Sequence, residues 1–117
     1  MNKAILIGHL GQDPEIKQFE DGTSVANFSV ATTEHWVDQQ GGRQSKTTWH
    51  HVQTFRPSLV GVIEKYLKQG AKVAVEGSIN SREYTKEGEA TARRHVYINI
   101  DSFEMLDKKP ENNDSKN

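Results

Sequence analysis

The chain has 117 residues, 33% hydrophobic and 26% charged, with a formal net charge of −1 at pH 7, which suits one soluble domain with a single core. It contains no cysteine, which excludes disulfides and thiolate metal sites, and no stretch near the ~20 apolar residues of a membrane-spanning helix. Its first fifteen residues lack the apolar segment of a secretory signal, so we expect an intracellular protein.

Strands separated by turns are predicted for the first half of the chain. Residues 3–10 form an apolar run, and residues 15–19 can be a short second piece of the same strand. Strand signals return over 24–36 and 47–55, which are rich in valine, threonine and aromatic residues. The polar stretch 37–46 between them is expected to form a long flexible hairpin loop.

The second half begins with the one helix candidate, residues 56–70. Ser58 is a candidate N-cap, and Gly70 stands where a C-terminal cap is expected. Apolar residues at spacings of three and four form one stripe: Leu59, Val62, Ile63, Tyr66 and Leu67. Two more strands are expected over 71–84 and 93–106.

This order of elements predicts an all-β OB-fold, a five-stranded Greek-key barrel with one α-helix between strands 3 and 4. An all-β sandwich is the competing interpretation, but it gives no reason for a helix in that place. The barrel is expected over residues 1–106. Residues 107–117 are one proline and otherwise only polar or charged residues, so we expect a disordered C-terminal tail.

Aromatic and basic residues coincide in the middle of the chain. Residues 43–95 contain ten basic and five acidic residues, and they include the strand TTWHHVQTF, residues 47–55. Trp49 and Phe55 share one face of that strand with threonine, histidine and glutamine, so neither face is cleanly apolar. Ordinary scatter of surface charge, with the rings in the core, is the alternative interpretation.

Rings spaced among cations suit a flexible single strand of nucleic acid, because its bases can stack while the cations meet its phosphates. A duplex hides its base faces. The expected stacking residues lie outside any apolar stripe: Trp36, Trp49, Phe55 and Tyr84. The expected phosphate contacts are the basic residues among them: Arg43, Lys46, Arg56, Lys72, Arg82 and Lys86.

The five histidines do not have the spacing of a metal site. His50 and His51 are adjacent and face opposite sides of a strand, and the other three lie in separate segments. We expect His9 and His50 in packing or an interface, and His51 near the ligand face. No nucleophile, phosphate-loop or paired-carboxylate motif is present, so we expect no enzyme, no cofactor and no metal. A metal-assisted hydrolase that uses the histidines is the rival from another class.

Five segments resemble, in order and spacing, the bacterial and mitochondrial single-stranded-DNA-binding proteins: MNKAILIGHLGQDPEI, SVANFSVATTEHW, TTWHHVQTF, EKYLKQGAKVAVEGSI and REYTKEGE. The resemblance implies an OB-fold that binds single-stranded DNA without catalysis, usually as a homotetramer, in replication, recombination and repair. The stacking positions of that family fall on the four rings named above. The fourth is usually tryptophan, so Tyr84 is expected to stack less strongly.

The resemblance also implies a subunit interface, in which the first strand pairs with its copy in a partner subunit. The implied interface residues are Lys3, Ile5, Ile7, His9 and His50. Bacterial members usually end in an acidic tip that recruits replication and repair proteins, whereas this chain ends in ENNDSKN. The expected location is the bacterial cytoplasm, with the mitochondrion as the alternative.

Two other binding modules remain open. An OB-fold protein–protein adaptor of the primosome type shares the fold but needs no ladder of stacking rings. An RNA-binding protein of the cold-shock type fits the same surface, since stacking does not by itself distinguish deoxyribose from ribose.

Overall fold

The computed structural model describes residues 1–107. Its elements are, in chain order, β1 (Ala4–Leu10), β2 (Glu15–Gln18), β3 (Ser24–Val37), β4 (Arg43–Thr54), α1 (Pro57–Tyr66), β5 (Lys72–Tyr84) and β6 (Arg93–Met105). The predicted tail, residues 107–117, lies outside the described residues except for Asp107. Within residues 1–107, no helix is long and apolar enough to cross a membrane.

The strands form a sheet that closes on itself as a barrel. Their order is β1-β5-β6-β4-β3-β2, and β1 also pairs with β3 at His9 and Leu10, which closes the ring. A short parallel pairing, Val52 with Ile98 and Gln53 with Asn99, joins β4 to β6. The predicted five-stranded OB barrel is confirmed, with α1 between β4 and β5. The predicted second piece of the first strand is instead a separate strand, β2, that pairs with β3.

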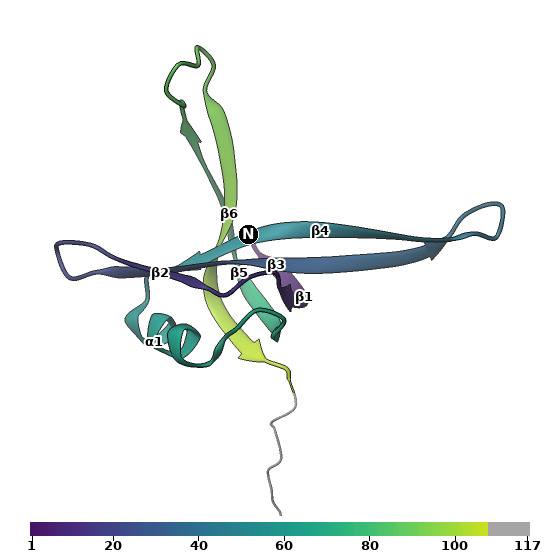
Figure 1. The fold of residues 1–117 in the computed structure, drawn as a ribbon, viewed down its shortest axis with the longest axis horizontal. Helices are drawn as coiled ribbons and strands as arrows, with labels where there is room; N and C mark the ends of the chain where they lie inside the picture. Colours follow the sequence, from purple (N-terminus) through teal and green to yellow (C-terminus); the bar gives the residue numbers. More distant parts are fainter. Residues whose placement is uncertain (108–117) are drawn as a thin grey trace, which may run out of the picture.

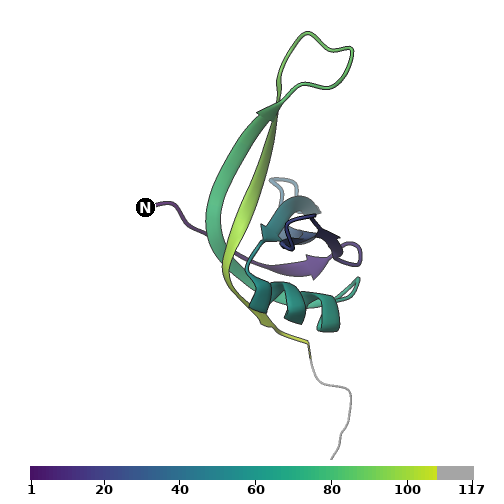
Figure 2. The same ribbon diagram turned by 90° about the vertical axis from the view of Figure 1, so that its left-hand side faces the viewer.

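Apolar side chains fill the barrel, and α1 covers one end of it (Figure 2). These side chains come from alternate strand positions and from one side of the helix. The clustered core residues are Leu10, Ala26, Phe28, Val30, Val52, Val60, Ile63, Leu67, Val73, Val75 and Ile100. Phe103 is only partly buried and packs against this cluster.

The helix is shorter than predicted and buries a different stripe. It begins at Pro57, with Arg56 as the N-cap residue and no side-chain cap, so the prediction that Ser58 caps it is wrong. Proline at the first helical position supplies a fixed φ and lacks the N–H group that a cap would satisfy. Val62 and Tyr66 are exposed, because the stripe of Val60, Ile63 and Leu67 is the one that faces the barrel.

Two hairpins extend beyond the barrel as long arms (Figure 1). In the first, β3 and β4 pair without a break as far as Val37 and Arg43, so the expected long loop over 37–46 is wrong. The turn is confined to the residues between that pair, where the Asp38 carboxylate accepts a 2.7 Å hydrogen bond from the Gly42 N–H. Both faces of such an arm meet solvent, and a polar composition therefore gives no strand signal.

The second arm consists of the outer halves of β5 and β6. These strands pair as far as Tyr84 and Arg93, with an irregularity in the pairing between Glu76 and Gly77. The two arms leave the barrel in different directions and flank one side of it (Figure 1). The fold therefore offers a surface much longer than the barrel itself.

The close approach of β5 to β6 at Gly77 predicts the effect of one substitution on stability. A Cβ atom at Gly77 would overlap the carbonyl oxygen of Asn99, so Gly77→Ala should lower the free energy of unfolding by about 1–3 kcal/mol, the usual cost of overpacking. Gly61→Ala is the matched control. Gly61 is an exposed residue of α1 with open space around its Cβ position, so this substitution should raise the free energy of unfolding by up to about 1 kcal/mol. Urea unfolding measures both, and an unchanged midpoint for Gly77→Ala would contradict the close approach.

Candidate nucleic-acid interface

Alternate residues of β4 point to the outside of the barrel. Register places His51 opposite Ser29 and Trp49 opposite Ala31, whereas Val52, the residue after His51, faces the core. This outer surface continues onto β5 and β6. We call it the aromatic face and define it by seven residues: Trp49, His51, Phe55, Arg82, Tyr84, His95 and Tyr97.

Trp49 lies on the β4 part of this face and is 56% exposed, which excludes it from the core. Its six-membered ring lies over Gly11, where a Cβ atom would overlap the ring. Glycine at position 11 therefore leaves the space that the indole ring of Trp49 occupies. An indole that packs against Gly11 and stays 56% exposed is a suitable platform for a nucleobase.

Phe55 and Tyr84 extend the aromatic face in two directions. Phe55 follows β4, is 52% exposed, and stacks on Phe19 with ring centroids 6.4 Å apart. Tyr84 ends β5 opposite Arg93 and is 38% exposed. Strand alternation places Tyr84 on the same side of the second arm as Arg82.

Trp36, the fourth predicted stacking residue, is 47% exposed but lies elsewhere. It pairs with Gln44 near the end of the first arm, at a position whose parity is opposite to that of Trp49 and its partner Ala31. The structure therefore brings three of the four predicted rings onto one face and puts Trp36 on the reverse of the arm. A ligand that contacts both tryptophans must pass around the arm.

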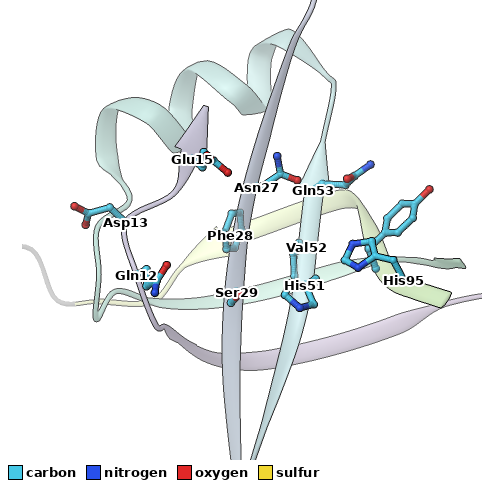
Figure 3. Close-up of a pocket in the computed structure, with 11 residues that line it drawn as sticks. Gln12, Asp13, Glu15, Asn27, Phe28, Ser29, His51, Val52, Gln53 and His95 are labelled. Carbon is cyan, nitrogen blue, oxygen red and sulfur yellow. The ribbon is translucent and has the colours of Figure 1, made fainter. Parts of the chain in front are cut away.

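A histidine–tyrosine stack, which the sequence analysis missed, lies between Trp49 and Phe55 on β4 and the second arm. The His51 and His95 rings are 5.2 Å apart by centroid, and the His95 and Tyr97 rings are 5.6 Å apart. Figure 3 shows His51 and His95 facing one another along a pocket. The signal was present, since His95 and Tyr97 alternate with Ile98 and Ile100, which point inward.

His95 is the titratable group most clearly affected by this arrangement. Partial burial lowers the pKa of its imidazole below the usual value, and the positive charges of His51 and Arg82 lower the pKa further. Each of these effects disfavours the imidazolium form. A phosphate placed beside His51 and His95 would instead raise the pKa of His95, because its negative charge favours the imidazolium form.

Five of the six predicted phosphate contacts lie on the arms or next to Phe55: Arg43, Lys46, Arg56, Arg82 and Lys86. The sequence predicted that Arg43 and Lys46 lie in a loop, but the structure places both within β4. Arg56 uses Nη1 to donate a 2.9 Å hydrogen bond to the Asp101 carbonyl, so it is partly engaged within the chain. Lys72 lies opposite His9 in the β1–β5 pair and is not brought together with the rings.

The predicted interface residues divide between two strands. Ile5, Ile7 and His9 are exposed at alternate positions of β1, and Lys3 forms a 2.7 Å ion pair with Glu76. His50 lies on β4, where its Nε2 is 2.9 Å from the Thr32 hydroxyl, and its side chain is partly buried. The structure thus places Ile5, Ile7 and His9 on β1 and His50 on β4, with β3 between the two strands.

No group of three or more histidine and carboxylate side chains within residues 1–107 could hold a metal ion. The His51–His95 pair is the nearest approach of two such ligands on the aromatic face. A structural zinc site needs four ligands, and a catalytic one needs three.

Comparison with known proteins agrees with this geometry. The model of the single-strand binding protein family matches residues 1–106. The chain is similar to a single-stranded DNA-binding protein of Neisseria meningitidis, with 42% identity over 113 residues (96% of this chain, 63% of that protein). It is also similar to one of Rhizobium meliloti, with 46% identity over 85 residues (72% of this chain, 49% of that protein).

A solved structure described as a complex of Plasmodium falciparum SSB with ssDNA matches with a TM-score of 0.84 and 34% identity, over 92% of this chain and 96% of that one. The chain spans between about half and two thirds of the length of the two bacterial relatives. The family match covers both the barrel and the two arms that bear the aromatic face. The chain belongs to the single-strand binding protein family.

Proposed function

We propose that this protein binds single-stranded DNA with little sequence preference, by stacking bases on exposed rings and contacting phosphates with nearby cations. The observation that carries the proposal is the aromatic face, on which Trp49, Phe55 and Tyr84 lie exposed beside Arg82. Large rings are costly to leave in water, so their exposure on one surface indicates a binding role. The ssDNA complex of the Plasmodium protein supports the choice of ligand.

The geometry favours a single strand over a duplex. Trp49 lies on β4, Phe55 follows that strand and Tyr84 ends β5, so the rings are spread over several strands, and a flexible chain can follow them. Each base that reaches a ring gains about 1–3 kcal/mol from stacking, and every base has a face to offer. A duplex keeps those faces in its own stack. The same reasoning explains binding without a preferred sequence.

We also propose that the protein acts as a homotetramer. Residues 4–8 of β1 pair with β5 along one edge only, since β3 reaches β1 at His9 and Leu10. An unpaired strand edge beside exposed Ile5 and Ile7 is a hazard unless another strand covers it. A second copy of β1 can pair there and bury both isoleucines.

Within this proposal the chain acts by binding and not by catalysis, and it protects single strands during replication, recombination and repair. The two bacterial relatives support a bacterial cytoplasm as the place of action. A protein–protein adaptor of the primosome type is the alternative. The exposure of Trp49, Phe55 and Tyr84 together favours the DNA-binding role, because an adaptor has no need of stacking rings.

Intrinsic fluorescence tests the proposed function, because Trp36 and Trp49 are the only tryptophans. Titration with oligo-dT should quench the emission strongly, and a duplex of equal length should quench it little. Trp36→Phe and Trp49→Phe separate the two signals, and each remaining tryptophan should be quenched. Absence of quenching by the single strand would overturn the proposal and leave the adaptor as the better account.

Sedimentation velocity tests the assembly. The wild-type protein should sediment as a tetramer, and Ile7→Glu should shift it to smaller species, since the carboxylate would be buried beside the new strand pair. Val62→Glu changes an exposed apolar residue on α1 in the same way and should leave the tetramer intact. A monomeric wild-type protein at micromolar concentration would contradict the paired edge.

Acidic pH should tighten DNA binding through His95. Because burial and the charges of His51 and Arg82 lower its pKa, the folded protein binds this proton less readily than the unfolded chain. This group's contribution to stability is therefore present above about pH 6.5 and lost as the pH falls below it. A bound phosphate favours the imidazolium, so DNA binding should take up a proton, although Asp13 and Glu15 line the same pocket and oppose the phosphate.

The measurement is the affinity for oligo-dT at about pH 8 and about pH 5.5, on either side of the histidine range. Affinity should rise on acidification in the wild type, and it should rise less in His95→Gln, which keeps a polar side chain of similar reach. Identical pH profiles for the two proteins would show that His95 does not face the phosphates.

A further inference from the structure

A second pocket, which we call the hollow, lies at the Phe55 end of the aromatic face, beside the turn between β2 and β3. It has a volume of about 410 Å³, within the ~300–1,000 Å³ typical of ligand sites. Phe19, Phe55 and Tyr97 supply rings to its walls, and Lys17 and Arg82 supply positive charges. Nothing in the sequence analysis pointed to Phe19.

Phe19 is an unusual residue for a tight hairpin turn, since it is large, apolar and 40% exposed. Its ring stacks on Phe55 with an interplanar angle of 24°, so the two form one broad platform. A centroid separation of 6.4 Å lies within the favourable range for offset aromatic pairs.

The turn that bears Phe19 is well ordered by its own hydrogen bonds. The Asp21 carboxylate accepts bonds from the Thr23 N–H and hydroxyl, at 3.0 and 2.7 Å, and these bonds lower the pKa of Asp21. Gly22 has a φ of +92°, which closes the turn, and its N–H donates to the Phe19 carbonyl. Phe19 is therefore held in place before any ligand arrives, which reduces the entropy lost on binding.

Charge in this hollow is of one sign. The Lys17 ammonium lies 5.7 Å from the centroid of the Phe19 ring, and Arg82, on β5, also lines the hollow. No aspartate or glutamate is among the residues that line it. The pocket beside His51 and His95 differs in this respect, because Asp13 and Glu15 line it. A phosphate beside the ring platform would thus meet two cations and no lining carboxylate.

Two amide side chains, Asn27 and Gln53, line the same hollow. They lie opposite one another on β3 and β4, and the Gln53 amide donates a 3.3 Å hydrogen bond to Asn99. Amides offer both donors and acceptors, as the edge of a nucleobase does. The hollow therefore presents rings, amides and cations, which match the base face, base edge and phosphate of one nucleotide.

We propose that this hollow is a nucleotide-binding subsite, in which Phe19 adds a stacking ring to Phe55 while Lys17 and Arg82 contact the phosphate. The inference rests on the proposed function, because it assigns one more contact to the same single strand. Phe19 also packs on Phe55, and a purely structural role in bracing that ring is the competing explanation. The two roles differ in what happens when both rings are removed.

The test is a double-mutant cycle on the full chain, with affinity for oligo-dT measured at a salt concentration that brings binding into range. Phe19→Leu should weaken binding about 5- to 150-fold, the usual value of one stacked base. Phe19→Tyr should restore it. Tyr66→Leu, which removes an exposed ring from α1 far from the hollow, is the matched control and should bind as the wild type does.

The double variant Phe19→Leu/Phe55→Leu separates the two roles. A subsite predicts that the double variant binds more weakly than Phe55→Leu alone, whereas a brace predicts equal affinity, and equality would overturn the proposal. Normal binding by Phe19→Leu, with a loss in Phe55→Leu, would also overturn it while the proposed function stands. Failure of the wild-type protein itself to bind oligo-dT would instead reject the proposed function. Thermal unfolding midpoints confirm that each variant is folded.

Discussion

Strand alternation around a small apolar core fixes where the functional side chains of this protein point. Once Val52 faces the barrel interior, Trp49, His51 and Phe55 must face outward, because successive side chains leave a strand on opposite sides. A shift of one residue would bury the rings and expose the core. The same strand register therefore places both the core and the aromatic face, and a change of register would disrupt both.

The strands stay hydrogen-bonded beyond the barrel, so the alternation of side chains continues along both arms and forms a long surface. The pairing of β3 with β4, and of β5 with β6, continues well past the core, so side chains such as Trp36 and Tyr84 are held by backbone geometry and not by packing. A single strand of DNA is flexible and exposes its bases, so it gains from contacts spread along such a path. Because Trp36 has the opposite parity to Trp49, a strand that contacts both tryptophans would have to pass around the first arm.

The sequence predicted the barrel, the helix position and the outward rings, because each leaves a periodic or compositional signal. It misplaced the first arm, since a polar ribbon exposed on both faces has no apolar alternation to detect. It also missed the His51–His95–Tyr97 stack and Phe19, whose roles depend on which strands become neighbours. The predicted cation Lys72 lies away from the rings, because position along the chain does not specify the side of a barrel.

The most direct test of the account is a map of where DNA touches the protein. Oligo-dT can be cross-linked to the full chain by ultraviolet light, and the modified residues can be identified by peptide mass spectrometry. The account predicts cross-links at Trp49, Phe55 and Tyr84, with none at Tyr66 on α1. Cross-links confined to α1 or to the exposed side of β1 would contradict it, since no residue of the aromatic face would then contact the DNA.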